Sequence, residues 1–170
     1  MRVKVKRVRR QRQPENIGSY CPQDLVLTGH WRFTLTDIIT GAVRVFEYDN
    51  LIPTCGRAAL ATQLVSGSPT VVLANKVALG TNTTAPANAD IKLGTETYRN
   101  SVASETSAFN VAYITGFFSA AECSGTYKEA GIFAGGTAAA DSGTLISHVA
   151  INLTKSSTET LTVDWQITIS

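Results

Sequence analysis

The stretch Leu161-Thr162-Val163-Asp164-Trp165-Gln166-Ile167-Thr168-Ile169 alternates apolar and polar side chains without a break. An earlier stretch alternates in the same way and carries on one face Leu145, Ser147, Val149, Ile151 and Leu153. Successive side chains of a strand point to opposite faces, so both stretches predict strands with one buried face and one face in water. This pattern is typical of antiparallel sheets, and it places Trp165 in the core.

Shorter patterns extend this reading toward the N-terminus. Trp31, Phe33 and Leu35 alternate with polar residues, and residues 37–41 supply a turn before a return strand over 43–48. Further strands are expected over 71–79, 109–118 and 127–133, with loops over 80–92 and 135–143. One helix is expected over Cys55–Val65, with Thr54 as its N-cap. Residues 25–170 therefore read as a single all-β domain, an antiparallel β-sandwich with one short α-helix.

Residues 1–24 read as an extended basic N-terminal arm in front of this domain. The residues expected to dock on a partner are Arg2, Val3, Lys4, Val5, Lys6, Arg7, Val8, Arg9, Arg10 and Arg12. No acidic residue lies among them, so residues 2–12 carry a charge of +7, whereas the rest of the chain carries −5. A block of like charge this dense is typical of an interaction tail.

Two kinds of partner fit the arm. The alternation Val3-Lys4-Val5-Lys6 favours an added strand on the exposed sheet edge of a neighbouring subunit. The seven cations could also neutralise phosphates, which leaves a nucleic-acid contact open as the alternative. No aromatic residue lies among them to stack on bases, so a protein partner is the preferred interpretation.

Composition bounds the function further. Hydrophobic residues make up 44% of the chain and charged residues only 16%, and threonine is abundant. Low charge is a solubility liability for a lone protein and is better tolerated where other subunits cover the surface. No apolar run is long enough to span a membrane as a helix, and no apolar run follows the N-terminal charges as in a secretory signal. We expect no membrane insertion.

The sequence offers no grouping of catalytic or metal-ligating residues. His30 and His148 stand singly in strand patterns, and Ser147 precedes His148 directly, so the two side chains point to opposite faces. Cys21, Cys55 and Cys123 lack a metal-ligand spacing and read as free thiols. We therefore expect no enzyme activity, no metal and no cofactor.

Several single residues carry expectations of their own. Glu129 lies in a small and apolar strand pattern, where its charge should face water, a sheet edge or a partner. Glu96 and Arg99 should pair within one helical turn or across a loop, and an exposed pair of this kind contributes only about 0–1 kcal/mol. Trp31, Tyr48 and Tyr113 are expected in the core rather than on a carbohydrate-binding surface.

The order of motifs from about residue 42 to residue 170 resembles a family of tailed-bacteriophage structural proteins, described as tail-fibre or tail-associated. The motifs, in chain order, are Tyr48-Asp49-Asn50-Leu51-Ile52, a helix of small residues from Gly56 to Leu64, Val77-Ala78-Leu79-Gly80-Thr81-Asn82-Thr83-Thr84-Ala85-Pro86, then Leu93, Glu96 and Arg99 at three-residue spacing, Lys128-Glu129-Ala130-Gly131-Ile132-Phe133 and Leu161–Ile167. The family usually has a second glycine where this chain has Asn82, a residue that tolerates left-handed backbone angles. The basic arm is not part of the pattern.

The resemblance implies a non-enzymatic virion component, assembled in the host cytoplasm. It would self-assemble in several copies and dock to neighbouring tail, neck or baseplate subunits. The arm lies outside the resemblance, and its charge makes it the expected docking segment. A capsid decoration protein is the first alternative. A nucleic-acid-binding module that uses the arm is the second alternative, and a host-surface or carbohydrate-binding domain is a third class.

Overall fold

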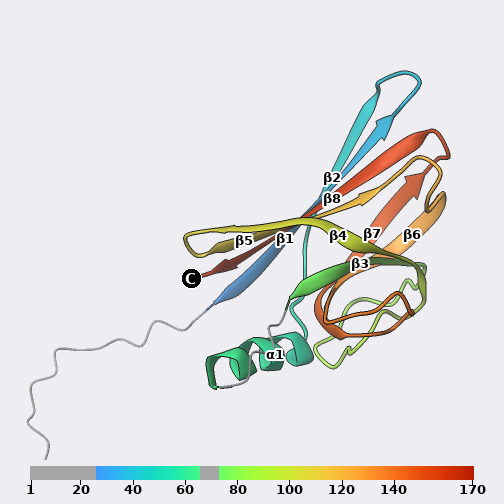
Figure 1. Ribbon diagram of the computed structural model, residues 1–170. Helices are drawn as coiled ribbons and strands as arrows, with labels where there is room; N and C mark the ends of the chain where they lie inside the picture. The colour runs from blue at the N-terminus through green and yellow to red at the C-terminus, as the bar shows by residue number, and fades with distance from the viewer. Residues whose placement is uncertain (1–25, 66–72) are drawn as a thin grey trace, which may run out of the picture.

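The computed structural model describes residues 26–65 and 73–170 of the chain. Within these residues the chain forms one helix and eight strands (Figure 1). In chain order they are β1 (Leu27–Asp37), β2 (Val43–Asp49), α1 (Thr54–Val65), β3 (Ala74–Gly80), β4 (Glu96–Ala108), β5 (Val111–Phe118), β6 (Gly125–Ala134), β7 (Thr144–Lys155) and β8 (Glu159–Ile169). The predicted all-β class with one short helix is confirmed, and the helix begins one residue earlier than predicted.

All strands belong to one antiparallel sheet in the order β2-β1-β8-β5-β4-β3-β6-β7. The sheet curls until its two end strands approach each other, which makes a nearly closed barrel. Leu51, just after β2, helps to close it, because its backbone exchanges two hydrogen bonds of 3.0 Å with His148 on β7. The antiparallel arrangement predicted from the alternating stretches is therefore confirmed.

The two halves of the sheet are joined through β4, which distinguishes this fold from the two separate sheets of the expected sandwich. Residues 96–101 of β4 pair with β3, and residues 102–108 pair with β5. In Figure 1 the strand runs from one half of the barrel to the other. The sequence did not predict this strand, because Glu96–Ala108 is rich in Ser, Thr and Glu and shows no apolar alternation.

The core lies between the two halves of the sheet. One half contributes the predicted apolar faces, namely Trp31, Phe33, Leu35, Leu161, Val163, Trp165 and Ile167, and the other half contributes Val77, Ile132, Val149 and Leu153. Trp31 stacks on Phe33 with ring centroids 5.4 Å apart, and its Nε1 donates to the Ser147 hydroxyl at 2.9 Å. Tyr48 packs edge-on against Phe33, as predicted, whereas the prediction for Tyr113 is wrong, because its side chain is exposed on the outer face.

Helix α1 packs against β7, and the two backbones come close together at Gly56 of the helix. A Cβ atom on Gly56 would come within 2.8 Å of the Ile146 Cα atom, so only glycine allows this approach. The neighbouring Cys55 thiol contacts the carbonyl oxygens of Leu145 at 3.1 Å and Asp90 at 3.2 Å. Cys55 and Cys123 are both free, as predicted, and burial raises the pKa of the Cys123 thiol to about 11. Cys21 lies outside the described residues.

Candidate assembly surfaces

The chain covers the outer face of one half of its barrel with its own segments. The outer side of β3, β6 and β7 carries a second apolar cluster, formed by Ala78, Leu93, Phe133 and Leu145 with Cys55 packed against it. Two loops, residues 81–95 and 135–143, and helix α1 supply this cover, as the lower part of Figure 1 shows. Two clusters of buried charged side chains hold the two loops in place.

The first cluster centres on Glu129 of β6, whose carboxylate is 1% exposed. It accepts backbone hydrogen bonds from Thr95 at 2.7 Å, Gly94 at 2.9 Å and Asn82 at 3.3 Å. Its Oε2 atom also lies 3.1 Å from His148 Nε2. The prediction that Glu129 faces water, an edge or a partner is therefore wrong. Loop 81–95 supplies the hydrogen bonds that a buried carboxylate needs.

Strand register explains why these side chains meet. Glu129 pairs with Gly80 on β3, where a Cβ atom would collide with the Glu129 side chain. Gly131 pairs with His148, which places the imidazole on the same outer face as Glu129. The other ring nitrogen of His148 lies 2.9 Å from Asp90 Oδ2, so the ring joins β6 and β7 to the covering loop.

The hydrogen bonds of the Glu129 cluster hold loop 81–95 on the barrel. Both Glu129 oxygens are occupied by loop N–H groups, and Ser147 faces the opposite side, where it bonds to Trp31 and Asn50. Every buried side-chain nitrogen and oxygen in the described residues has a hydrogen-bond partner. In the same residues, no group of three or more His, Cys, Asp and Glu side chains is placed to hold a metal ion.

The second cluster is the ion pair between Glu96 and Arg99. The Arg99 guanidinium binds both Glu96 oxygens, at 2.6 and 2.8 Å, and lies 4.3 Å from the centre of the Phe133 ring. It also donates to the Ser142 carbonyl oxygen at 2.8 Å, and the Glu96 carboxylate accepts from the Asp141 backbone at 3.1 Å. The cluster therefore ties loop 135–143 to β4.

Two expectations for the Glu96–Arg99 pair are wrong: the pair is not exposed, and it does not lie in a helical turn or across a loop. Solvent reaches the backbone at these positions, but the side chains of Arg99 and Glu96 are only 4% and 2% exposed. They lie on a strand, where residues three apart normally face opposite sides. The β3–β4 register shifts between Leu79 and Gly80, which inserts Thr97 as an extra residue and turns Glu96 to the same face as Arg99.

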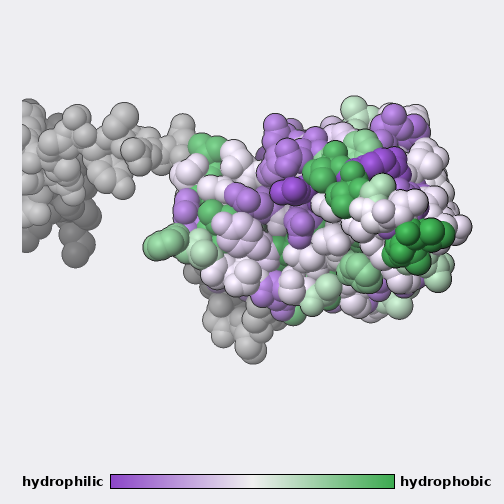
Figure 2. Space-filling model, turned by 90° about the horizontal axis from the view of Figure 1, so that it is seen from above, coloured by the Kyte–Doolittle hydropathy of each residue, from purple (hydrophilic) through white to green (hydrophobic). Residues whose placement is uncertain are grey.

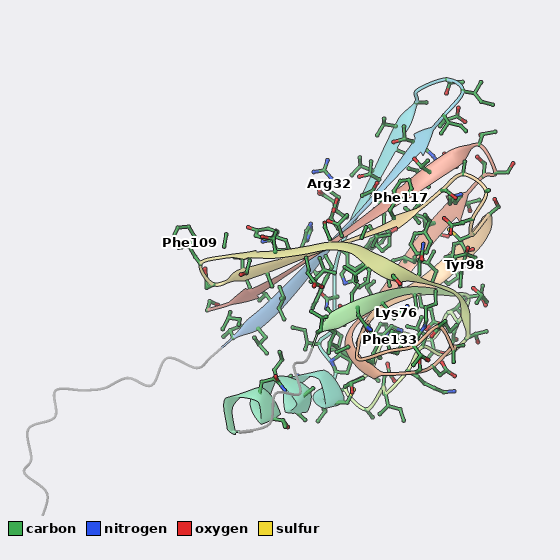
Figure 3. The ribbon with its side chains drawn as sticks, in the orientation of Figure 1. Arg32, Lys76, Tyr98, Phe109, Phe117 and Phe133 are labelled. Carbon is green, nitrogen blue, oxygen red and sulfur yellow. The ribbon has the colours of Figure 1, made fainter. Side chains whose placement is uncertain are left out.

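The other half of the barrel has no such cover from the described residues. Its outer face includes three rows of side chains that cross all four strands β2, β1, β8 and β5 at paired positions. The rows are Val45-Thr34-Thr162-Phe117, Glu47-Arg32-Asp164-Thr115 and Asp49-His30-Gln166-Tyr113. We call these twelve residues the open face. Arg32 and Phe117 point away from the core in Figure 3.

The open face combines exposed apolar side chains with neutralised charges. Phe117 and Tyr113 are 45% and 39% exposed along β5, and Val45 is 43% exposed on β2. Between them, Asp164 accepts a hydrogen bond of 2.8 Å from Thr115, and Arg32 lies 3.9 Å from Glu47. A hollow of about 360 Å³ follows the two polar rows. Seen from above, the protein shows hydrophilic and hydrophobic patches side by side (Figure 2).

The β1–β2 hairpin extends the apolar surface beyond the barrel. Its turn exposes Ile38 and Ile39, which are 62% and 76% accessible. Asp37 fixes this turn: its carboxylate accepts hydrogen bonds from the Thr158 hydroxyl and from the backbone of Thr40 and Ile39, which lower its pKa to about 2. The predicted turn at Asp37 is thus confirmed, and it presents two isoleucines to solvent.

The structure does not describe the partner-docking residues predicted from the sequence. Arg2 through Arg12 belong to residues 1–25, which are outside the described residues, so their docking role stays a prediction. The open face was not predicted as a site. The sequence does contain an indication of it, because the polar residues that alternate within 161–169, together with Arg32 and Thr34, were expected to face water. Only the strand register shows that these positions lie side by side.

Comparison with known proteins gives no relative. No family model, curated protein sequence or solved structure matches this chain. In the part of the chain that the structure describes, no helix has the length and apolar character needed to cross a membrane.

Proposed function

We propose that this chain is a non-enzymatic structural component of a bacteriophage virion, assembled in several copies and docked to neighbouring tail, neck or baseplate subunits. The unequal covering of the barrel is the observation that carries the proposal. Buried charged clusters fasten two loops over one half, whereas the open face leaves Phe117, Tyr113 and Val45 in water. Exposed aromatic side chains interspersed with polar groups are also found in non-obligate protein–protein interfaces.

The composition and the motif order support the same class of function. With 16% charged residues, the chain has little charge to keep a free surface soluble. The charges on the open face lie beside opposite charges or hydroxyl groups, which limits the desolvation cost of covering them. The resemblance to tail-associated proteins supplies the virion context.

Self-association of the full-length protein tests this proposal. Sedimentation should show a concentration-dependent oligomer, and fractionation should place the chain in virions. Changing both Val45 and Phe117 to Glu puts unpaired charge on the open face, so the oligomer should dissociate at least about 10-fold more readily. Ile91→Glu, on the covered half, should leave the oligomer unchanged. A protein that stays monomeric at every concentration and is absent from virions would contradict the proposal.

The arm should act as a tether onto a neighbouring subunit. Its +7 charge opposes the −5 of the remaining chain, and Val3, Val5 and Val8 add apolar contact. Deleting residues 2–12 should therefore weaken assembly, and changing Val3 and Val5 to Ser should also weaken it although every charge is kept. Both effects are measured by sedimentation over a range of salt concentrations.

Nucleic-acid binding is the competing role for the same residues, because seven cations can neutralise seven phosphates. Binding through all of them would give a log–log salt dependence of up to about −6. If the deletion leaves assembly intact but removes tight DNA binding with such a slope, the tether role is wrong and the nucleic-acid role replaces it.

A further inference from the structure

The β4–β5 hairpin carries an aromatic side chain at its tip that no other part of the described chain covers. Phe109 is fully exposed, and no other large apolar side chain among the described residues is as accessible. Figure 3 shows it at the end of the hairpin, pointing away from the barrel. A phenyl ring in water is unfavourable, so this position gains nothing from the ring in the isolated molecule.

The backbone at this tip adds a second unfavourable feature. Ala108 pairs with Val111, which makes Phe109 and Asn110 the two residues of a tight turn. Phe109 has a φ of 54°, in the left-handed region that glycine, asparagine and aspartate favour and bulky residues avoid. Strain of this kind is typical of binding sites.

The tip is nevertheless held firmly against the end of β8. The Asn110 side chain donates to the Ile169 carbonyl oxygen at 2.8 Å, and the Ile169 backbone N–H donates to the Asn110 carbonyl oxygen at 3.0 Å. These bonds fix the direction of the hairpin and therefore the place of the Phe109 ring. An aromatic ring on a fixed backbone loses little conformational freedom when it is buried by a partner.

A hollow of matching chemistry lies beside the same hairpin and begins at its second residue pair from the turn, Ser107 and Ala112. It measures about 340 Å³ and is lined mainly by Leu60, Ala74, Ala112, Ile114, Trp165 and Ile167. An apolar cavity of about 150 Å³ can bind benzene, so this hollow has room for a phenyl ring. Among the described residues, 102–108 of β4 pair with β5 and with no other strand, so no further strand closes this end of the hollow.

We propose that Phe109 of one copy inserts into this hollow of a second copy. The two features complement each other in size and chemistry, and both occur on one chain. Ala112 pairs with Ser107, next to the Ala108–Val111 pair that closes the turn, so the hollow begins about 7 Å from the tip. Two antiparallel hairpins that overlap over this length would each place Phe109 at the hollow of the other. Such a pair would be a two-fold dimer, and a one-way contact would extend into a ring or filament. This inference rests on the proposed self-assembly and names one contact within it.

Phe109→Gly is the direct test, in the full-length protein. Glycine removes the ring and suits the positive φ, so the variant should unfold at no lower temperature than the parent. Its self-association, measured by sedimentation equilibrium, should weaken by about 30-fold or more, as for a central aromatic anchor. Ile91→Ser removes another exposed apolar side chain and should leave the dissociation constant unchanged.

Mixing two variants tests the hollow itself. Ala112→Phe fills the hollow but keeps the Phe109 ring, whereas Phe109→Gly lacks the ring but keeps the hollow. Each alone should self-associate weakly, and their mixture should form mixed complexes through the one intact contact. If Ala112→Phe unfolds early, Ser107→Phe fills the same hollow from an exposed position on β4.

The outcomes separate this contact from the wider proposal. If Phe109→Gly associates as tightly as the parent, or the mixture forms no mixed complexes, the Phe109 contact is wrong, while open-face variants still test the assembly role. If the parent itself does not self-associate, both proposals fail.

Discussion

Replacing Arg99 with alanine should lower the free energy of unfolding by about 3–5 kcal/mol, measured by urea denaturation. The change leaves the Glu96 carboxylate, 2% exposed, without the guanidinium that binds both of its oxygens. It also removes the donor to the Ser142 carbonyl oxygen and the stacking on Phe133. A buried charge that loses its partner keeps its desolvation penalty, so this loss exceeds that of an exposed pair.

Two further variants make the Arg99 result specific. Arg32→Ala breaks an ion pair whose side chains are 54% and 55% exposed, and it should change stability by less than about 0.5 kcal/mol. Arg99→Lys keeps the charge but cannot bind two oxygens in one plane, so it should fall between the two alanine variants. Equal losses for Arg99→Ala and Arg32→Ala would show that the Glu96 cluster does not anchor loop 135–143.

The alternating stretches correctly predicted those strands in which every second side chain is apolar and also lies in the core. The strands that contain Trp31 and Trp165 each have one face in the core and one outside, so a period of two in the sequence was sufficient. Strand β4 lacks that period because residues 103–108 are exposed along their whole length. Its place in the sheet depends on pairing with β3 and β5, which is a property of the assembled fold.

The charged clusters could not be predicted for a different reason. Glu129 depends on loop N–H groups 34 to 47 residues away in sequence, and Arg99 meets Ser142 across 43 residues. A sequence shows that a charge interrupts an apolar strand, but it does not show which segment will supply the compensating hydrogen bonds. The β-bulge that brings Glu96 and Arg99 to one face is equally hidden, because it depends on the β3–β4 register.

The open face lies between these two cases. Its polar residues on β8, Thr162, Asp164 and Gln166, were expected to face water, and they lie on the outer side. The positions beside them on β2 and β5 could be identified only from the strand register. Tyr113 was predicted to lie in the core because its strand alternates, and the alternation does not show which of the two sides is buried. Sequence reasoning thus identified wet positions strand by strand but not the surface that they form.

Replacing Glu129 with alanine should have an effect as large as that of Arg99→Ala, a loss of about 3–5 kcal/mol in the free energy of unfolding. The carboxylate accepts from the backbone of Asn82, Gly94 and Thr95 and contacts His148, and alanine leaves these groups facing an apolar strand. Buried donors without an acceptor cost about 1–3 kcal/mol each, and water entering the vacated space would offset part of that sum.

Local and global effects of this substitution can be separated by hydrogen exchange. Because Glu129 is the acceptor for three loop N–H groups, the Gly94 and Thr95 amides should exchange much faster in Glu129→Ala, while the core of β8 keeps its protection. Glu47→Ala removes a carboxylate that is 55% exposed on the open face and should leave both stability and loop exchange unchanged. If Glu129→Ala unfolds at the same urea concentration as Glu47→Ala, the carboxylate is not what fastens loop 81–95 over the barrel, and the covered half must be held by its apolar contacts at Leu93 and Phe133.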